Sequence, residues 1–164
     1  MKKKYSLWIR PTGQIDTVLQ DWVHHLSEKF AGPLFKPHMT LLGSFSAVKE
    51  EAIEKTNQLV KQLTPFPIDL QGISFSTTYY QNVFVRVKSS AKLLEANLLA
   101  KEIFGMSNHV FMPHISLLYG NHSMQEREMI VKDILLKEPL SFMAEAIEIV
   151  PEAGINEDGI RISL

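Results

Sequence analysis

Two short stretches of the chain place a hydroxyl side chain two residues after a histidine. His38 and Thr40 lie in Lys-Pro-His-Met-Thr-Leu-Leu, and His114 and Ser116 lie in Met-Pro-His-Ile-Ser-Leu-Leu. Because side chains alternate between the two faces of a strand, each histidine shares a face with its hydroxyl. Each stretch therefore offers an imidazole beside a hydroxyl on one face, while apolar side chains occupy the other face.

An imidazole and a hydroxyl, each supplied twice, are suited to phosphodiester hydrolysis. An unperturbed histidine has a pKa of about 6.5, so near neutral pH one imidazole can be neutral while a second is protonated. The neutral ring can take a proton from an attacking water, and the protonated ring can give one to the leaving ester oxygen. A lone histidine in a strand more often has a structural role, but the repeated motif favours a catalytic pair. We therefore predict His38 and His114 as general acid and general base, in either order, with Thr40 and Ser116 holding the phosphate oxygens.

The hydrophobic pattern predicts the order strand, helix, strand, helix, strand in each half of the chain. In the first half, we expect strands at residues 5–9, 37–45 and 68–75, and helices at 15–30 and 48–63. In the second half, we expect strands at residues 83–87, 111–119 and 140–150, helices at 91–104 and 123–136, and a closing strand at 160–164. Ser46 is a candidate N-cap for the second helix, and Ser123 with Glu126 has the pattern of a capping box.

The two halves are related by a constant offset in the sequence. The histidine motifs lie 76 residues apart in a chain of 164, and the same offset relates Lys4 to Tyr80, near the starts of corresponding strands. We therefore expect one domain over residues 1–164, formed by an internal repeat of roughly residues 4–75 and 80–150. A pseudo-two-fold axis between the repeats would bring the motif strands together, so that two histidines and two hydroxyls surround one point.

The composition narrows the classes of function. The chain has 17 Lys and Arg against 18 Asp and Glu, which argues against a binder of long nucleic-acid duplexes. The absence of cysteine excludes disulfides and cysteine zinc sites, and it fits a reducing, cytoplasmic location. The sequence has no His-x-His or His-x₃-His pair and no carboxylate beside either motif, so we expect no metal and no other cofactor. No apolar run approaches the length of a membrane span, so we expect no membrane partner.

The two motifs and the duplicated order of elements resemble the 2H phosphoesterases, a family named for two His-x-Thr/Ser motifs. Residues 111–120 resemble most the cyclic phosphodiesterase branch of that family. The resemblance implies an α+β fold that is bilobal, with concave antiparallel sheets lining a central cleft and helices outside. It also implies metal-independent hydrolysis of a small nucleotide or ADP-ribose cyclic phosphate, with the catalytic and phosphate-holding roles at His38, Thr40, His114 and Ser116.

Further residues are candidates for substrate binding. Tyr119 matches an aromatic position near the ligand in the cyclic phosphodiesterase branch, but strict alternation would place it on the face opposite His114. The strand must therefore end or bulge before Tyr119 for this role to hold. Trp8 and Arg10 share a strand face that could line the cleft, where Trp8 would stack on a base and Arg10 would pair with a phosphate.

Other aromatic and histidine side chains are given lesser roles. We expect Tyr79 and Tyr80 to pack in the core or in turns at the junction of the halves rather than to form a base-stacking surface. His109 lies in a polar loop before the second motif and is a candidate for the rim of the cleft. His122 precedes a predicted helix, and we expect it on the surface.

The sequence leaves other functions open. One is processing of RNA ends that carry a 2′,3′-cyclic phosphate, or a 2′,5′-RNA ligase-like activity. That branch usually has an aromatic residue before the glycine after its first motif, where this chain has Leu41-Leu42-Gly43. The other is a catalytically silent nucleotide-binding module. The expected partners are a small nucleotide or ADP-ribose cyclic phosphate, or RNA termini, and we expect a monomer.

Overall fold

The computed structural model of the protein describes residues 1–137, 140–152 and 159–164. In chain order, the described residues form β1 (Lys3–Ile9), α1 (Gln14–Phe30), β2 (Met39–Ala47), α2 (Lys49–Val60), β3 (Phe66–Phe75), β4 (Val83–Val87), α3 (Ala91–Phe104), β5 (His114–Leu118), α4 (Met124–Asp133), β6 (Ser141–Ala144), β7 (Ala146–Pro151) and β8 (Ile160–Ser163).

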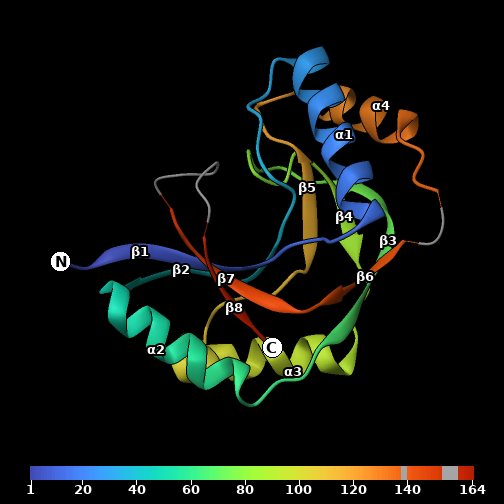
Figure 1. The fold of residues 1–164 in the computed structure, drawn as a ribbon. Helices are drawn as coiled ribbons and strands as arrows, with labels where there is room; N and C mark the ends of the chain where they lie inside the picture. Colours follow the sequence, from blue (N-terminus) through green and yellow to red (C-terminus); the bar gives the residue numbers. More distant parts are fainter. Residues whose placement is uncertain (138–139, 153–158) are drawn as a thin grey trace.

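The strands form one eight-stranded sheet in the order β6-β3-β4-β5-β2-β1-β7-β8. All of the strand pairings described are antiparallel. The sheet is curled, and the helices lie outside it in two pairs, α1 with α4 and α2 with α3 (Figure 1). α1 packs on β5 and α4 on β3 and β4, whereas α2 packs on β7 and β8 and α3 on β2. The structure therefore has the bilobal α+β fold that the sequence predicts.

Each lobe takes its outer helices from both halves of the sequence. α1 precedes β2 in the chain but packs on β5, and α3 precedes β5 but packs on β2. In the same way, β3 pairs with β4 of the second half, and β7 pairs with β1 of the first. The lobes therefore do not coincide with the sequence halves, and this exchange ties both halves into one sheet.

The strand pairs β1–β2 and β4–β5 have the same register once the sequence offset of 76 is applied. The matching partners are Leu7 with Leu42, Trp8 with Thr40 and Ile9 with Met39 in the first pair, and Val83 with Leu118, Phe84 with Ser116 and Val85 with Ile115 in the second. Both pairs shift by one residue at corresponding places, which marks a bulge at Leu41 and at Leu117. Each bulge directly follows the hydroxyl residue of a motif and so re-aims the side chains beyond it.

The ends of the helices agree with the sequence in part. The capping box of Ser123 and Glu126 is present, and α3 ends at Gly105 in the left-handed conformation. The prediction for Ser46 is wrong, because Ser46 lies within β2 and α2 begins after Val48. α4 ends at residue 133 rather than at 136.

Three of the predicted strands also differ from those in the structure. Residues 140–150 do not form one strand, because the chain breaks at Glu145 into β6, which pairs with β3, and β7, which pairs with β1. The central strands begin two and three residues later than predicted. The reason is that Pro37 and Pro113 lack the backbone N–H that strand pairing requires.

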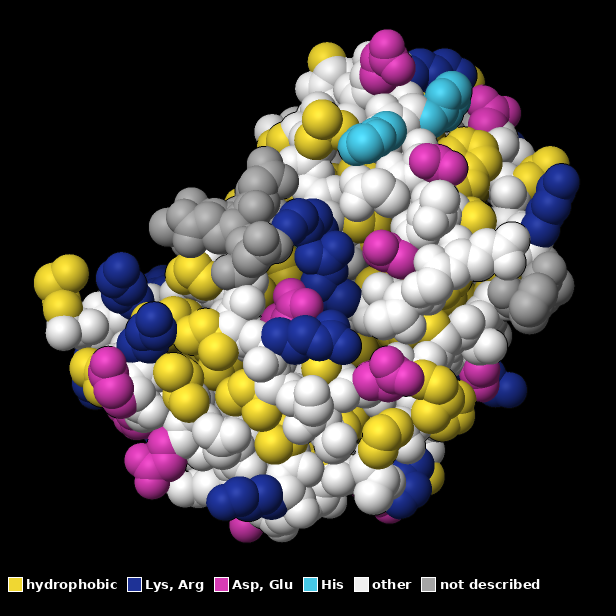
Figure 2. Space-filling view, viewed as in Figure 1, with side chains coloured by type: hydrophobic (Ala, Val, Ile, Leu, Met, Phe, Trp, Pro, Cys, Tyr) yellow, Lys and Arg dark blue, Asp and Glu magenta, His cyan; other side chains and the backbone are white. Residues whose placement is uncertain are grey.

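The charged side chains do not gather into one extended basic surface on the face drawn in Figure 2. Lys and Arg side chains are interspersed there with Asp and Glu, apart from a small group of basic side chains near the middle. This distribution agrees with the near balance of charge in the sequence. Among the described residues, no helix is both long enough and apolar enough to cross a bilayer.

Candidate active site

A cavity of about 850 Å³ is lined by residues from both halves of the sequence. Its walls include His38, Thr40, His114 and Ser116, so the structure brings the two predicted motifs to one place. The order of the strands explains this convergence. β2 and β5 are neighbours at the centre of the sheet, and the residues that directly follow the two histidines pair with each other there.

The other face of each motif strand is anchored in the hydrophobic core. Met39 and Leu41 in β2 and Ile115 and Leu117 in β5 are 0% exposed. Burying a side chain of this size stabilises the fold by roughly 1.5–3 kcal/mol. Because neighbouring side chains point to opposite faces, this anchoring turns the histidine and the hydroxyl of each motif into the cavity.

His38 lies beneath the indole of Trp8. The two rings are stacked, with centroids 3.5 Å apart and planes inclined by 6°, and His38 is 8% exposed. Burial lowers the pKa of His38 to about 4, although the hydrogen bond to the Lys36 carbonyl acts in the opposite direction. The positive charges of Arg10 and His114 contribute to the same lowering. The imidazole of His38 is therefore neutral near pH 7.

His114 has a more open environment than its counterpart. Its ring meets Phe84 edge-on, with centroids 5.2 Å apart. Burial lowers the pKa of His114, and the hydrogen bond to the Met112 carbonyl acts to raise it. The two histidines thus lie at equivalent positions of two strand pairs with matching register, but His38 is stacked under a ring and His114 is not.

Both imidazoles are oriented in the same way by the backbone. Nδ1 of His38 lies 2.8 Å from the carbonyl oxygen of Lys36, and Nδ1 of His114 lies 2.8 Å from that of Met112. A carbonyl oxygen only accepts hydrogen bonds, so Nδ1 of each ring carries a proton and donates it. Nε2 of each ring is therefore the atom that can take up or release a proton.

The hydroxyl residues of the two motifs differ in their contacts. Ser116 Oγ donates a hydrogen bond to the carbonyl oxygen of Tyr80 at 2.7 Å. Thr40 is the cross-strand partner of Trp8. A hydroxyl hydrogen can rotate about its C–O bond, so Ser116 can turn its proton from the carbonyl to a ligand without moving its oxygen. Both hydroxyls line the cavity and can donate to an anionic oxygen there.

Tyr119 also lines the cavity, because the strand before it is interrupted. β5 ends at Leu118 and carries its bulge just before that residue. The bulge cancels the alternation that would place Tyr119 on the face opposite the histidine. The ring of Tyr119 stacks on Phe35, with centroids 3.8 Å apart. Burial raises the pKa of Tyr119, and a hydrogen bond with Ser116 only partly offsets this, so the phenol remains protonated.

Trp8 and Arg10 are placed differently relative to the cavity. Trp8 lines it, but one face of its indole is covered by His38. Arg10 is not among the lining residues, and its positive charge acts on His38 instead. The structure therefore brings Trp8 to the site as a neighbour of a predicted catalytic ring, and it does not bring Arg10 to the cavity wall.

Several lining residues come from loops that the motifs did not single out. Tyr80 lies in a turn, which is one of the two places expected for it, but it is 61% exposed and also lines the cavity. His109 lies at the rim, and it approaches Gly43 so closely that a Cβ there would lie 2.6 Å from the imidazole Nε2. Residues 110–112, and residues 150–152 at the end of β7, also line the cavity. The sequence of a loop has no hydrophobic periodicity, so only its aromatic residues could have indicated that it lines the cavity.

The chemistry that the cavity offers is proton transfer and hydrogen bonding to a bound anion. It holds two imidazole Nε2 atoms and the hydroxyls of Thr40, Ser116 and Tyr119. Over residues 1–137, 140–152 and 159–164, no group of three or more His, Cys, Asp or Glu side chains is placed to hold a metal ion.

Comparison with known proteins places this geometry in a family. Residues 13–155 match the family model described as the 2′-5′ RNA ligase superfamily. A cyclic phosphodiesterase of Arabidopsis thaliana is 27% identical over 128 residues, which cover 77% of this chain and 71% of that protein. A putative phosphoesterase of Oceanobacillus iheyensis is 27% identical over 121 residues, 70% of this chain and 69% of that one. E. coli LigT, in its complex with 3′-AMP, shares the fold over 100% of this chain and 96% of its own, with a TM-score of 0.63 at 13% identity.

Proposed function

The chain belongs to the 2′-5′ RNA ligase superfamily of 2H phosphoesterases, and from that membership we propose that it hydrolyses a small cyclic phosphodiester by histidine acid–base catalysis. Phosphoester hydrolysis is the activity named for its relatives from A. thaliana and O. iheyensis. The observation that supports acid–base catalysis by two histidines is the arrangement of the two imidazoles. His38 and His114 are each held at Nδ1 by a backbone carbonyl and line the same cavity.

The proposed reaction consumes one water molecule. The water oxygen forms a bond to phosphorus while the bond from phosphorus to one ester oxygen of the ring breaks. Nε2 of one histidine takes the proton from the water, and Nε2 of the other gives a proton to the departing oxygen. The products are a phosphomonoester and a free hydroxyl on the neighbouring carbon. Proton exchange with solvent returns both histidines to their starting states.

We assign the base role to His38 and the acid role to His114. His38 is buried beneath Trp8 and feels the positive charge of Arg10, and both influences favour the neutral ring. His114 is more open, and an anionic phosphate in the cavity would favour its protonated form. The assignment separates two residues that the sequence motifs alone leave equivalent.

Thr40 and Ser116 are proposed to hold the non-bridging phosphate oxygens. Hydrogen bonds from neutral hydroxyls to a charged oxygen are stronger than those between neutral groups. They also stabilise the transition state, in which negative charge gathers on these oxygens. Tyr119, whose phenol is protonated and lines the same wall, can serve as a further donor.

A nucleotide-sized substrate fits the dimensions and lining of the cavity. Small-ligand sites commonly enclose roughly 300–1,000 Å³, and this cavity measures about 850 Å³. The exposed ring of Tyr80 on its wall offers a surface for a base. E. coli LigT, which shares the fold, has been solved with 3′-AMP, with NADP⁺ and with ATP. These observations support a nucleoside or ADP-ribose cyclic phosphate as substrate.

An RNA end bearing a 2′,3′-cyclic phosphate is the alternative substrate. The description of the superfamily, which refers to RNA ligation, favours it. The net charge of −1 speaks against long contacts with an RNA backbone, because such contacts require several Lys and Arg side chains. The small cyclic phosphate is therefore the function that the site supports best.

The test of the proposal is a substrate comparison in the presence of EDTA. Rates would be measured for 2′,3′-cyclic AMP, ADP-ribose 1″,2″-cyclic phosphate and a short RNA ending in a 2′,3′-cyclic phosphate. We expect turnover of one of the small substrates with a higher kcat/KM than that of the RNA. A higher kcat/KM for the RNA would replace the proposed substrate with RNA ends. Loss of activity in EDTA that returns on addition of a metal ion would overturn the metal-free mechanism.

A further inference from the structure

A buried arginine outside the cavity holds the loops that form one side of it. Arg127, in the first half of α4, is 2% exposed. Nε donates to the carbonyl oxygen of His122 at 2.9 Å, and Nη1 donates to those of Ser76 and Thr78 at 2.6 and 2.8 Å. Nη2 donates to the carbonyl oxygen of Gly120 at 3.3 Å. All three guanidinium nitrogens are thus directed at backbone carbonyls.

The four carbonyls belong to two segments that flank the second motif. Residues 76–82 connect β3 to β4, and residues 119–123 connect β5 to α4. The backbone N–H of Gly120 donates to the carbonyl of Tyr79 at 3.1 Å, and Asn82 Nδ2 donates to the carbonyl of Gly120 at 3.0 Å. Gly120 has φ 149°, which favours glycine, and a Cβ there would lie 2.6 Å from the imidazole of His122. The two segments are therefore fixed to each other as well as to Arg127.

His122, expected on the surface, is partly exposed and also belongs to this network. Its Nδ1 accepts a hydrogen bond from Asn82 Nδ2, and its Nε2 lies 3.0 Å from the carbonyl oxygen of Phe30 in α1. Since that carbonyl can only accept, Nε2 carries the ring proton. The imidazole thus links the turn after β5 to the helix that packs on β5.

The network reaches the cavity through Tyr80. Its carbonyl oxygen, two residues after the Thr78 carbonyl that Arg127 holds, accepts the hydrogen bond of Ser116 Oγ at 2.7 Å. That bond sets where the hydroxyl oxygen of the second motif lies. A shift of the loop by a fraction of an ångström would move this oxygen relative to the phosphate, and hydrogen bonds weaken steeply with distance and angle.

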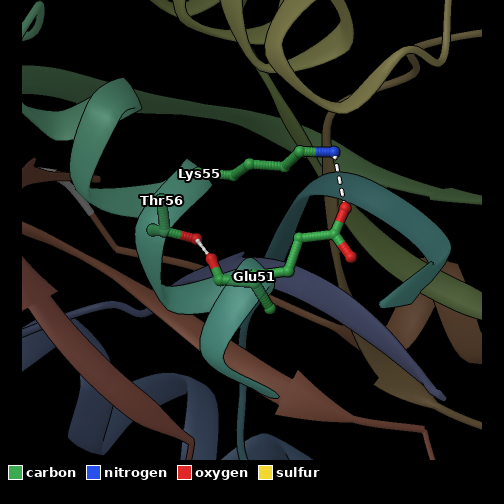
Figure 3. Close-up of polar contacts among 4 residues, drawn as sticks. Glu51, Lys55 and Thr56 are labelled. Atoms are coloured by element: carbon green, nitrogen blue, oxygen red, sulfur yellow. Dashed lines mark hydrogen bonds and ion pairs between the residues drawn. The ribbon is translucent and has the colours of Figure 1, made fainter. Parts of the chain in front are cut away.

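The equivalent helix position in the first half of the chain holds a different kind of side chain. Applying the offset of 76 places Glu51 of α2 at the position of Arg127. Glu51 lies along the helix surface and pairs with Lys55 at 3.0 Å, one turn further on (Figure 3). Both side chains of this pair are about one-third exposed, at 38% and 32%. The backbone next to Thr40, the counterpart of Ser116, is held instead from α3, where the buried Asn97 donates to the carbonyl oxygen of Leu41 at 2.8 Å.

We propose that Arg127 is a positioning residue for the second motif, which fixes the Tyr80 carbonyl and through it the hydroxyl of Ser116. The inference rests on the proposed function, because it assigns Ser116 to the substrate phosphate. Burying a guanidinium near a helix N-terminus is unfavourable for solvation and for the helix dipole. Arginine is nevertheless suited to this place because its planar fork presents several N–H donors in fixed directions, whereas a lysine presents its donors from one atom.

The test is a pair of double-mutant cycles built on Arg127→Lys. Rates of cyclic phosphate hydrolysis would be measured for this variant alone, with Ser116→Ala and with Thr40→Ala. We expect Arg127→Lys to lower kcat/KM on the order of tenfold in the wild-type and Thr40→Ala backgrounds, and less than about twofold with Ser116→Ala, because residues in one network are non-additive. Glu51→Gln, at the equivalent helix position, should leave kcat/KM unchanged.

An equal loss in both backgrounds would overturn the proposal, since a general loss of stability makes no distinction between the two hydroxyls. Should Arg127→Lys fail to fold, Asn82→Ala replaces it, because Asn82 holds the same Gly120 carbonyl. The same cycles would be run on the dissociation constant of 3′-AMP. If the wild type binds 3′-AMP but hydrolyses none of the substrates, the proposed function is overturned. The double-mutant cycle measured on the dissociation constant would then decide the role of Arg127. If the wild type neither binds 3′-AMP nor hydrolyses the cyclic phosphates, both the proposed function and the role of Arg127 are overturned.

Discussion

Met39 pairs with Ile115 where the two central strands meet, and each of these residues directly follows one of the two histidines. Both side chains are 0% exposed. The separation of His38 and His114 is therefore set by strand pairing rather than by loops. A site built on paired strands is held more rigidly than one built on connections.

The pH dependence of kcat/KM follows from the two histidines. Burial lowers the pKa of His38 to about 4 and also lowers that of His114. Activity requires a neutral His38 and a protonated His114, so we expect a bell-shaped profile of kcat/KM with its maximum below the ordinary histidine pKa of about 6.5. The kcat profile should lie at higher pH, because a bound anion favours both protonated rings. A kcat/KM that rises and then stays level to pH 9 would remove His114 as the acid.

Replacing the ring that covers His38 should change its titration. Trp8→Leu removes the stacked indole, so water reaches the imidazole and the pKa of His38 should rise from about 4 toward its ordinary value. NMR titration of the histidine ring protons measures this directly. Phe84→Leu, the equivalent change beside His114, is the matched control and should leave the pKa of His38 unchanged. An unmoved pKa of His38 in Trp8→Leu would mean that the indole does not desolvate it.

The stability of the fold should also depend on His38. Its pKa is lower in the folded protein than in the unfolded chain, so the unfolded chain binds the proton more readily. The contribution of His38 to the free energy of unfolding should therefore be complete above the ordinary pKa of about 6.5. It should be lost as the pH is lowered toward 4. Urea unfolding across this range should show a shallower fall for His38→Asn than for the wild type. Parallel curves for the two proteins would contradict the lowered pKa.

Much of the fold and of the site could be predicted from the sequence. The repeated motif and its offset predicted that His38, Thr40, His114 and Ser116 come together, because alternation in strands and a shared axis leave one place for them to meet. The sequence also indicated that Tyr119 could face the cavity only if the strand ended or bulged before it, and the structure contains this bulge. We propose, on the matching registers of the two strand pairs, that residues 1–164 form one domain built by duplication.

The parts that could not be predicted depend on contacts distant in the sequence. The loop that carries Tyr80 is held by Arg127, which lies 47 residues after Tyr80 and donates to the backbone carbonyls of Ser76 and Thr78. Such contacts leave no pattern of side-chain types. In the same way, the exchange of helices between the lobes and the break at Glu145 depend on which strand lies next to which. Local periodicity carries no information about these choices.

The two motif hydroxyls should matter less than the histidines. A hydrogen bond to a charged group contributes about 1.5–3 kcal/mol, so Thr40→Val and Ser116→Ala should each lower kcat/KM by about 10- to 150-fold. Thr40→Val keeps the shape of the side chain and removes only the donor. Steady-state kinetics on the best cyclic phosphate would measure the loss. Full activity in both variants would mean that neither hydroxyl holds the phosphate.

The most direct test of the catalytic pair is hydrolysis of that cyclic phosphate by the wild type, His38→Ala and His114→Ala, with EDTA present and with folding checked by circular dichroism. Each histidine is expected to contribute about 10²- to 10⁴-fold. We predict that both single variants fold and that each loses activity by at least the lower of these factors. A folded variant of either histidine that retains wild-type turnover would contradict the paired mechanism.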